Sequence, residues 1–213
     1  KSAEDRERAA IGLGAIATKV GGKNAPMPLG AEPWLMQALP ALLDGYGDKN
    51  EAAKKAAEGA VGAFVPLFPA EAASELLAVL YQVLESSSAK WQAKVGALKI
   101  IGRLADLAYE QVGDEVTQMT PVLTQAMHET KAEVSKQAIK TATKVCGVID
   151  NNDIRPFIPD LVGCMARPDS VPACIKKLSS ITFVAEVTGP ALAVMVPLLS
   201  RALNERSQTV QRQ

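Results

Sequence analysis

The sequence predicts an all-α protein, a HEAT-repeat α-solenoid in which antiparallel helix pairs stack into a right-handed superhelix. Hydrophobic residues make up 48% of the 213 residues but aromatic residues only 4%, so the apolar residues are mostly Ala, Leu, Val and Ile. Such a composition favours packed helices over sheets. An apolar helical pattern also recurs about every 40 residues, which is the period of HEAT and armadillo arrays. Two helices in each unit, rather than three, favour HEAT.

The recurrence is anchored on a proline inside an apolar helical pattern, Pro197 in "AVMVPLLSRAL". Successive steps of 38, 38, 43 and 38 residues toward the N-terminus lead to Pro159, Pro121, Ala78 and Pro40. Two residues later there is always a leucine, at Leu42, Leu80, Leu123, Leu161 and Leu199. Six residues later there is always a large side chain, at Tyr46, Leu84, Met127, Met165 and Leu203. Because a proline inside a helix costs about 3 kcal/mol, its repeated use predicts a kink that bends the first helix of each unit around the stack.

Each unit is predicted to hold two helices joined by a polar turn, and the units together to form a single domain over 1–213. Residues 1–22 form the second helix of a partial unit, and the Gly/Pro-rich stretch 21–33 is a loop between units. Full units are expected at about 33–68, 74–108, 115–149 and 154–188, and residues 190–213 begin a truncated unit. The turns are "GDKNE", "ESSSAK", "HETKAE", "RPDS" and "NERSQ". The chain starts without Met and inside a helical pattern, so we expect it to be a piece of a longer protein.

Charge and cysteine content limit the classes of partner. With 23 basic and 23 acidic residues, the chain lacks the basic excess of a dedicated nucleic-acid domain, so any such contact must come from a local patch. The three cysteines form no CxxC motif, and we expect reduced, buried thiols in an intracellular protein. Cys164 and Cys174 flank one turn and are interpreted as packing residues. No apolar run approaches the roughly 20 residues of a membrane span, so no membrane partner is expected.

Motifs for catalysis are missing from the sequence. There is no GxxxxGK[ST], GxSxG or HExxH, and the single histidine, His128, lies in a predicted turn without a nucleophile placed against it. We therefore expect no catalytic residues, no metal site, no cofactor and no small-molecule substrate for this chain, which is not expected to be an enzyme by itself.

Lysines recur early in the predicted second helices, and two interpretations stay open. Acidic residues recur in the turns, so the lysines could form a structural ladder of ion pairs within or between units. Alternatively they could form a basic strip that grips phosphates, because second helices of a solenoid line one surface. Lys136, Lys140 and Lys144 are spaced by four and share a helical face. The full candidate set for such a phosphate-binding strip is Lys90, Lys94, Lys136, Lys140, Lys144, Lys176 and Lys177. Trp91, beside the first two, occupies an apolar repeat position and is interpreted as core packing.

Several segments of the sequence also resemble a known protein family. "TFVAEVTGPALAVMVPLLSRALNER", "DNNDIRPFIPDLVGCMARPDSVP" and "MTPVLTQAMHETKAEVSKQA" resemble the HEAT-repeat domain of fungal translation elongation factor 3. "KWQAKVGAL" and "EPWLMQALPALL" fit the same region in order, so the resemblance covers about residues 30–213.

The resemblance implies a cytoplasmic, ribosome-associated ATPase of the ABC class that helps deacylated tRNA leave the exit site. In that family the HEAT array docks on the ribosome, whereas ATP and Mg belong to nucleotide-binding domains absent here. The implied partners are rRNA and ribosomal proteins, and we expect a monomer. The alternative is a protein–protein scaffold, such as the elongation-factor-3-like region of a large HEAT-repeat activator that senses stalled ribosomes.

Overall fold

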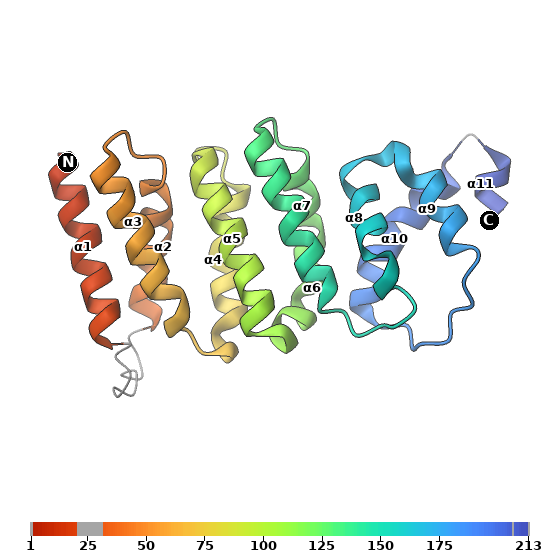
Figure 1. The fold of residues 1–213 in the computed structure, drawn as a ribbon, viewed down its shortest axis with the longest axis horizontal. Coiled ribbons are helices and arrows are strands. Elements are labelled where there is room, and N and C mark those ends of the chain that lie inside the picture. The colour runs from red at the N-terminus through yellow and green to blue at the C-terminus, as the bar shows by residue number, and fades with distance from the viewer. Residues whose placement is uncertain (1, 21–31, 206, 213) are drawn as a thin grey trace. The chain divides into compact units, whose positions relative to one another are not determined.

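The computed structural model describes residues 2–20, 32–205 and 207–212, and this part of the chain contains helices and no strand (Figure 1). The prediction of an all-α fold is therefore confirmed. Its α-helices are α1 Ala3–Val20, α2 Glu32–Gly45, α3 Glu51–Phe64, α4 Ala73–Glu85, α5 Trp91–Leu107, α6 Tyr109–Met127, α7 Ala132–Gly147, α8 Ile158–Ala166, α9 Val171–Leu178, α10 Gly189–Leu203 and α11 Gln208–Arg212. Four 3₁₀ turns connect them, namely η1 Val65–Leu67, η2 Ala70–Ala72, η3 Arg155–Phe157 and η4 Pro168–Ser170.

The helices pair as the repeat pattern predicts. Short turns join α2 to α3, α4 to α5, α6 to α7 and α8 to α9, and α10 packs against α11. The chain divides into two compact units, 1–101 and 102–213, and the division falls within α5. The prediction of a single domain over the whole chain stays a prediction.

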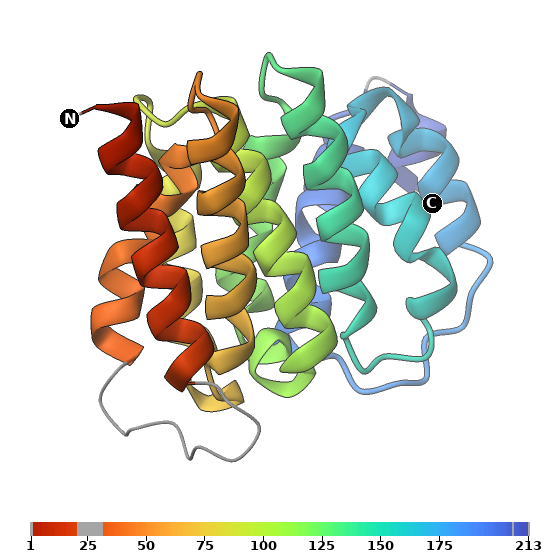
Figure 2. The ribbon, with the colours of Figure 1, turned by 60° about the vertical axis from the view of Figure 1, so that its left-hand side comes forward.

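In the first unit, 1–101, the long helix α1 packs along α3, and α2 packs against both α3 and α4. Figures 1 and 2 both show α1 and α3 side by side. Alanines make this close approach possible, because Ala53, Ala57 and Ala60 are all buried along α3. Asn50 starts α3 by accepting hydrogen bonds from the backbone N–H groups of Ala52 and Ala53, which would otherwise lack partners.

In the second unit, 102–213, α6 packs against α7 and α10, and α8 packs against α7, α9 and α10. The core-facing residues follow helical periodicity. On α7 the buried positions are Val134, Ala138, Thr141, Ala142, Val145 and Cys146, which leaves the opposite face to polar residues.

The leucine two residues after each repeat anchor is the clearest core position. Leu42, Leu80, Leu123 and Leu161 are at most 5% exposed, but Leu199 is 42% exposed. The large side chains four residues after these leucines follow the same trend. Leu84, Met127 and Met165 are buried and Tyr46 is half-buried, whereas Leu203 on α10 is 66% exposed. The pattern therefore identified core positions in four helices, whereas on α10 the same positions face outward.

Three of the four anchoring prolines lie inside helices. Pro40 is in α2, Pro121 in α6 and Pro197 in α10. Pro159 is different, because it lies in the first turn of α8. Backbone N–H groups there have no partner within the helix, so a proline costs no helical hydrogen bond. The expectation that Pro159 kinks the first helix of the fourth unit was therefore wrong, and the bending of the other three helices stays a prediction.

Two boundaries in the second unit differ from the predicted ones. Helix α6 begins at Tyr109, six residues before the predicted start at 115, because Gly113 and Asp114 continue the helix instead of ending a loop. Helix α9 ends at Leu178 and no helix covers residues 181–188. Asp153 fixes that segment, since its Oδ2 accepts hydrogen bonds from the backbone N–H groups of Val184 and Ala185, both at 2.7 Å.

The linker at 21–33 mostly lies outside the described residues, and its last two residues already belong to α2. Among the helices that the structure describes, none alone is long and apolar enough to cross a bilayer. One pair, Glu51–Leu67 with Ala70–Glu85, meets the length and composition criteria together, with a bend of 116° between its two parts.

Candidate nucleic-acid interface

Three of the predicted lysines lie along one exposed face of α7. Lys136, Lys140 and Lys144 are each exposed and spaced by about one turn, so the face spans about 12 Å at 1.5 Å per residue. The helix is anchored at its start by Ser135, whose hydroxyl donates to the carbonyl oxygen of Met127 at 2.7 Å. Burial of the opposite face on α6 and α8 holds these lysines toward solvent.

The three α7 lysines differ in their contacts. The Lys144 ammonium forms an ion pair with Asp106 on α5 and lies 3.4 Å from the carbonyl oxygen of Gly102. Neither Lys136 nor Lys140 forms an ion pair with any residue in the described ranges. These two ammonium groups are therefore the part of the face that is available to an external anion.

A second pair of predicted lysines ends α9. Lys177 forms an ion pair with Asp160 of α8 at 2.7 Å, and this hydrogen bond is the main cause of its raised pKa. Lys176 is exposed, and no carboxylate among the described residues pairs with it. Both lie in the last turn of the helix, where the helix dipole favours positive charge.

The remaining two candidate lysines belong to the first unit. The Nζ of Lys90 lies 3.4 Å from Asp44 Oδ1 and 3.4 Å from the carbonyl oxygen of the same residue. Lys94 is half-buried on α5 and also has an interaction partner. Trp91 is the first residue of α5 and is 37% exposed, so its interpretation as a core residue was wrong.

Ion pairs connect neighbouring helices within each of the two units. Asp48, in the turn after α2, accepts two hydrogen bonds from Arg6 of α1, at 2.6 Å and 3.0 Å. This contact is the main reason why the pKa of Asp48 lies well below its usual value. Lys90, Lys144 and Lys177 each have one of the other carboxylates described above. The ion-paired lysines, Lys90, Lys144 and Lys177, therefore fit the ladder hypothesis. Lys136, Lys140 and Lys176 have no ion pair among the described residues and fit the strip hypothesis.

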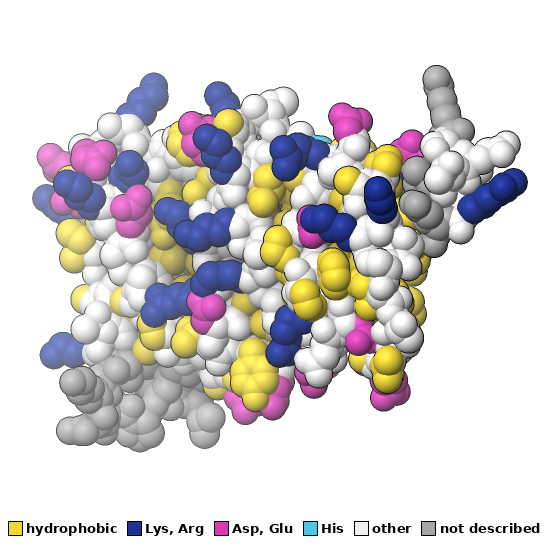
Figure 3. Space-filling model, turned by 45° about the vertical axis from the view of Figure 1, so that its right-hand side comes forward, with side chains coloured by type: hydrophobic (Ala, Val, Ile, Leu, Met, Phe, Trp, Pro, Cys, Tyr) yellow, Lys and Arg dark blue, Asp and Glu magenta, His cyan; other side chains and the backbone are white. Residues whose placement is uncertain are grey.

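Figure 3 shows one face of the molecule, where Lys and Arg side chains lie among apolar and acidic ones. Exposed ion pairs contribute only about 0–1 kcal/mol each, so a phosphate could displace the carboxylate partner of a paired lysine at small cost. An interface of this kind would read backbone shape and charge rather than base sequence.

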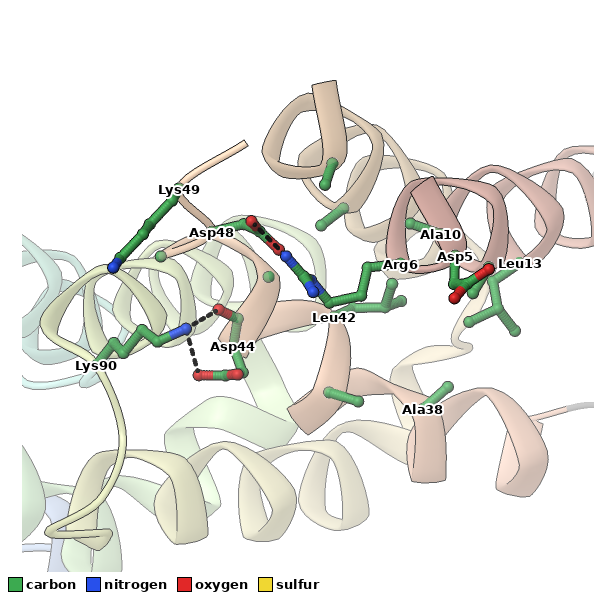
Figure 4. A pocket seen from close by; sticks show the side chains of 16 residues that line it. Asp5, Arg6, Ala10, Leu13, Ala38, Leu42, Asp44, Asp48, Lys49 and Lys90 are labelled. Carbon is green, nitrogen blue, oxygen red and sulfur yellow. Dashed lines mark hydrogen bonds and ion pairs between the residues drawn. The ribbon is translucent and has the colours of Figure 1, made fainter. Parts of the chain in front are cut away.

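A groove in the first unit was not anticipated from the sequence. It has a volume of about 810 Å³ and lies between α1, α2, the start of α3 and Lys90 (Figure 4). Its apolar part includes Ala10, Leu13, Ala38 and Leu42, and the Arg6–Asp48 and Lys90–Asp44 pairs lie at its charged end. The groove forms between helices of different predicted units, so no single helical pattern reveals it.

No group of three or more His, Cys, Asp and Glu side chains that could hold a metal ion occurs among the residues that the structure describes. His128 lies in the turn after α6, as predicted, and its Nε2 is 3.1 Å from the carbonyl oxygen of Met165. All three cysteines are buried and free of disulfide bonds.

Stacked helix pairs with a buried leucine at a fixed repeat position and lysines on the outward side of the second helix define an α-helical repeat protein of the HEAT class. Comparison with known families makes this more specific. The family described as "EF3 N-terminal HEAT repeat" matches residues 1–142, and "Elongation factor 3/GNC1 HEAT repeat" matches residues 169–213. The chain therefore belongs to the family of elongation factor 3 N-terminal HEAT repeats, as the sequence resemblance indicated.

Individual relatives agree with this family. The chain is 42% identical over all of its 213 residues to a protein named mRNA export factor elf1 from Schizosaccharomyces pombe, and covers 20% of that protein. It is 42% identical over 182 residues to elongation factor 3 of Phytophthora infestans, with 85% of the chain and 17% of the relative covered. It is 37% identical over 212 residues to elongation factor 3B of Saccharomyces cerevisiae, again covering 20% of the relative. The chain thus spans about a fifth of the length of these relatives, and the matched regions are HEAT repeats, without an ATPase domain.

Proposed function

We propose that this chain is the ribosome-docking HEAT module of an elongation-factor-3-type protein that works in the cytoplasm. In this proposal, ABC-type ATPase domains outside the chain perform the ATP-dependent release of tRNA from the exit site. The HEAT module contributes a surface that contacts rRNA phosphates and ribosomal proteins, and has no catalytic role. The observation that carries the proposal is the exposed α7 face, on which Lys136 and Lys140 have no carboxylate partner among the described residues. The relatives named elongation factor 3 support the choice of the ribosome as the target.

Charge and packing on α7 favour a phosphate ligand. An ammonium that binds a phosphate releases condensed counterions, so affinity falls as salt rises, with a slope of about 0.7–0.9 for each phosphate neutralised. Two free lysines one turn apart follow a backbone rather than a single base. Loss of both should therefore lower the salt slope by about 1.4–1.8.

The test is co-sedimentation of the chain with purified 80S ribosomes across a salt series. The variant is K136E/K140E, because changing Lys144 as well would place a new carboxylate beside Asp106 and disturb the array. The matched control is K19E/K55E, which changes the net charge equally at two exposed lysines, on α1 and α3, that have no ion pair among the described residues. We expect the first variant to bind more weakly and with a flatter salt dependence, and the control to bind like the parent chain. Equal binding by parent and K136E/K140E would exclude the α7 face as the docking surface.

A protein–protein scaffold is the second candidate, favoured by two observations. The groove of the first unit is lined in part by apolar residues, among them Ala10, Leu13, Ala38 and Leu42. Helix α10 exposes a stripe of apolar side chains at helical spacing, Leu192, Val196, Leu199 and Leu203. One relative, 42% identical over the whole chain, is named an mRNA export factor rather than an elongation factor. Binding to a protein partner through these apolar surfaces would persist at high salt, which separates the two candidates.

A further inference from the structure

Two cysteines of the second unit share one small hollow. Cys164 lies on α8 and Cys174 on α9, and the two helices pack together across the turn that contains η4. Both residues line the same hollow of about 140 Å³, together with Asp160, Ser170 and Lys177. Side chains from two packed helices thus converge on one point, although ten residues separate them in the sequence.

The surroundings of the two thiols show that they interact. The Ser170 hydroxyl donates to the carbonyl oxygen of Arg167 at 2.7 Å, and its Oγ lies 3.4 Å from Cys164 Sγ within the hollow. The pKa of Cys174 is raised to about 12, mainly by burial and also by the neighbouring Cys164 thiol, through its charge and a side-chain hydrogen bond. The residues are only 2% and 3% exposed, so the hollow is the route by which a small molecule reaches them.

We propose that Cys164 and Cys174 form a reversible oxidation site at which a hydroperoxide joins the two thiols into a disulfide between α8 and α9. The hollow suits a small oxidant, because a water molecule in liquid occupies about 30 Å³. The convergence of the two side chains suits the short, fixed geometry of a disulfide. The oxidation site lies within the second unit alone and does not depend on the proposed ribosome contact.

The reaction balances with the hydroperoxide as the only co-reactant. One thiol loses its proton, and its sulfur attacks the terminal peroxide oxygen, so that an S–O bond forms and the O–O bond breaks. The proton passes to the leaving oxygen, which departs as an alcohol or as water, and a sulfenic acid remains. The second sulfur then attacks the sulfenic sulfur, and its proton leaves with the hydroxyl as water. The two thiols are oxidised by two electrons, the peroxide is reduced, and a dithiol reductant reverses the change by exchange.

The high pKa of Cys174 sets the conditions of the reaction. Because the thiolate is the nucleophile, the mostly protonated Cys174 reacts slowly at low peroxide concentration. Once formed, the disulfide restrains α9 relative to α8. The Lys177–Asp160 ion pair already connects the same two helices at this hollow. It also lies close to the contact in which Arg201 of α10 donates to the carbonyl oxygen of Cys164 at 3.3 Å.

Peptide mapping tests the proposal, because the sequence separates the three cysteines at aspartates. Cleavage before each Asp places Cys146 in 114–149, Cys164 in 160–168 and Cys174 in 169–213. The chain is treated with hydrogen peroxide, alkylated, digested without reductant and analysed by mass spectrometry. We expect 160–168 linked to 169–213, with the loss of two hydrogens, while Cys146 stays an alkylated thiol. Dithiothreitol should release the two peptides.

Cysteine variants supply the controls, and far-UV circular dichroism confirms that each is folded. C146S removes the third buried thiol, which does not line the hollow, and should still form the link. C164S and C174S should lose it, and peroxide should raise the thermal midpoint of the parent chain but of neither variant. The proposal is overturned if the parent chain links through Cys146, links only between molecules, or oxidises to sulfinic acids without a link.

Discussion

The leucine at the second position after each repeat anchor offers a matched test of how packing distributes stability. Leu123 on α6 is 1% exposed, whereas Leu199 on α10 is 42% exposed, and both helices belong to the second unit and contact each other. Replacing each with alanine removes the same atoms from the same repeat position. The two variants, L123A and L199A, therefore differ mainly in burial.

The expected costs follow from that difference. Leu→Ala in a closed core costs about 2–5 kcal/mol, because the lost transfer free energy is joined by the cost of a cavity. At Leu199 roughly three-fifths of the side chain is shielded, so the transfer part is about 1–1.5 kcal/mol, and solvent fills the vacated space. We therefore expect L123A to lose about 2 kcal/mol more than L199A, which is the difference between the middles of the two ranges.

Urea unfolding followed by circular dichroism measures both variants. With a denaturant slope of about 2–3 kcal/mol/M, a loss of 3 kcal/mol lowers the midpoint by about 1 M. L123A should show such a shift and L199A less than half of it, with similar slopes. Equal shifts would refute the argument, since they would mean that the two positions are equally packed.

Two further predictions concern a glycine pair and an acid-sensitive ion pair. G96A should destabilise the chain by about 1–3 kcal/mol in thermal unfolding, because the added Cβ would lie 2.8 Å from buried Leu43 and from the Tyr46 ring. G59A should stabilise α3 by up to about 1 kcal/mol, because an added Cβ there has no neighbour within 4 Å. Changes of the same sign in both variants would contradict this account. Because Arg6 lowers the pKa of Asp48 in the folded state, their pair stabilises the fold fully above the unfolded pKa near 3.8 and progressively less as pH falls below it. D48N should therefore have a lower thermal midpoint than the parent chain at neutral pH. A difference in midpoint that does not shrink in acid would argue against the pairing with Arg6.

The shared face of the three α7 lysines could be predicted from their spacing in the sequence. Lys136, Lys140 and Lys144 are one turn apart, and a helix whose other face is apolar must present them together. The contacts of these lysines could not be predicted from spacing. Asp106 lies 38 residues from Lys144 in the sequence, and the packing of the helices brings the two side chains together. The same holds for Asp48, which pairs with Arg6 of a helix before the linker rather than with a lysine of its own unit.

The fold shows a similar division. The recurring leucine and the polar turns determined the helix pairs and their order, because helical periodicity and turn chemistry are local properties of the sequence. The start of α6 and the meaning of Pro159 were misjudged, since the same residues can begin a helix or continue one.

By itself, the sequence determined the class of this protein: an all-α HEAT array of the elongation factor 3 family, with lysines along its second helices. Only the tertiary structure decided which of those lysines have carboxylate partners, that Leu199 faces outward, and that Cys164 and Cys174 share a hollow. Periodicity says which residues of a helix lie on one face, but long-range packing brings charges and thiols together, and it depends on residues far away in the chain.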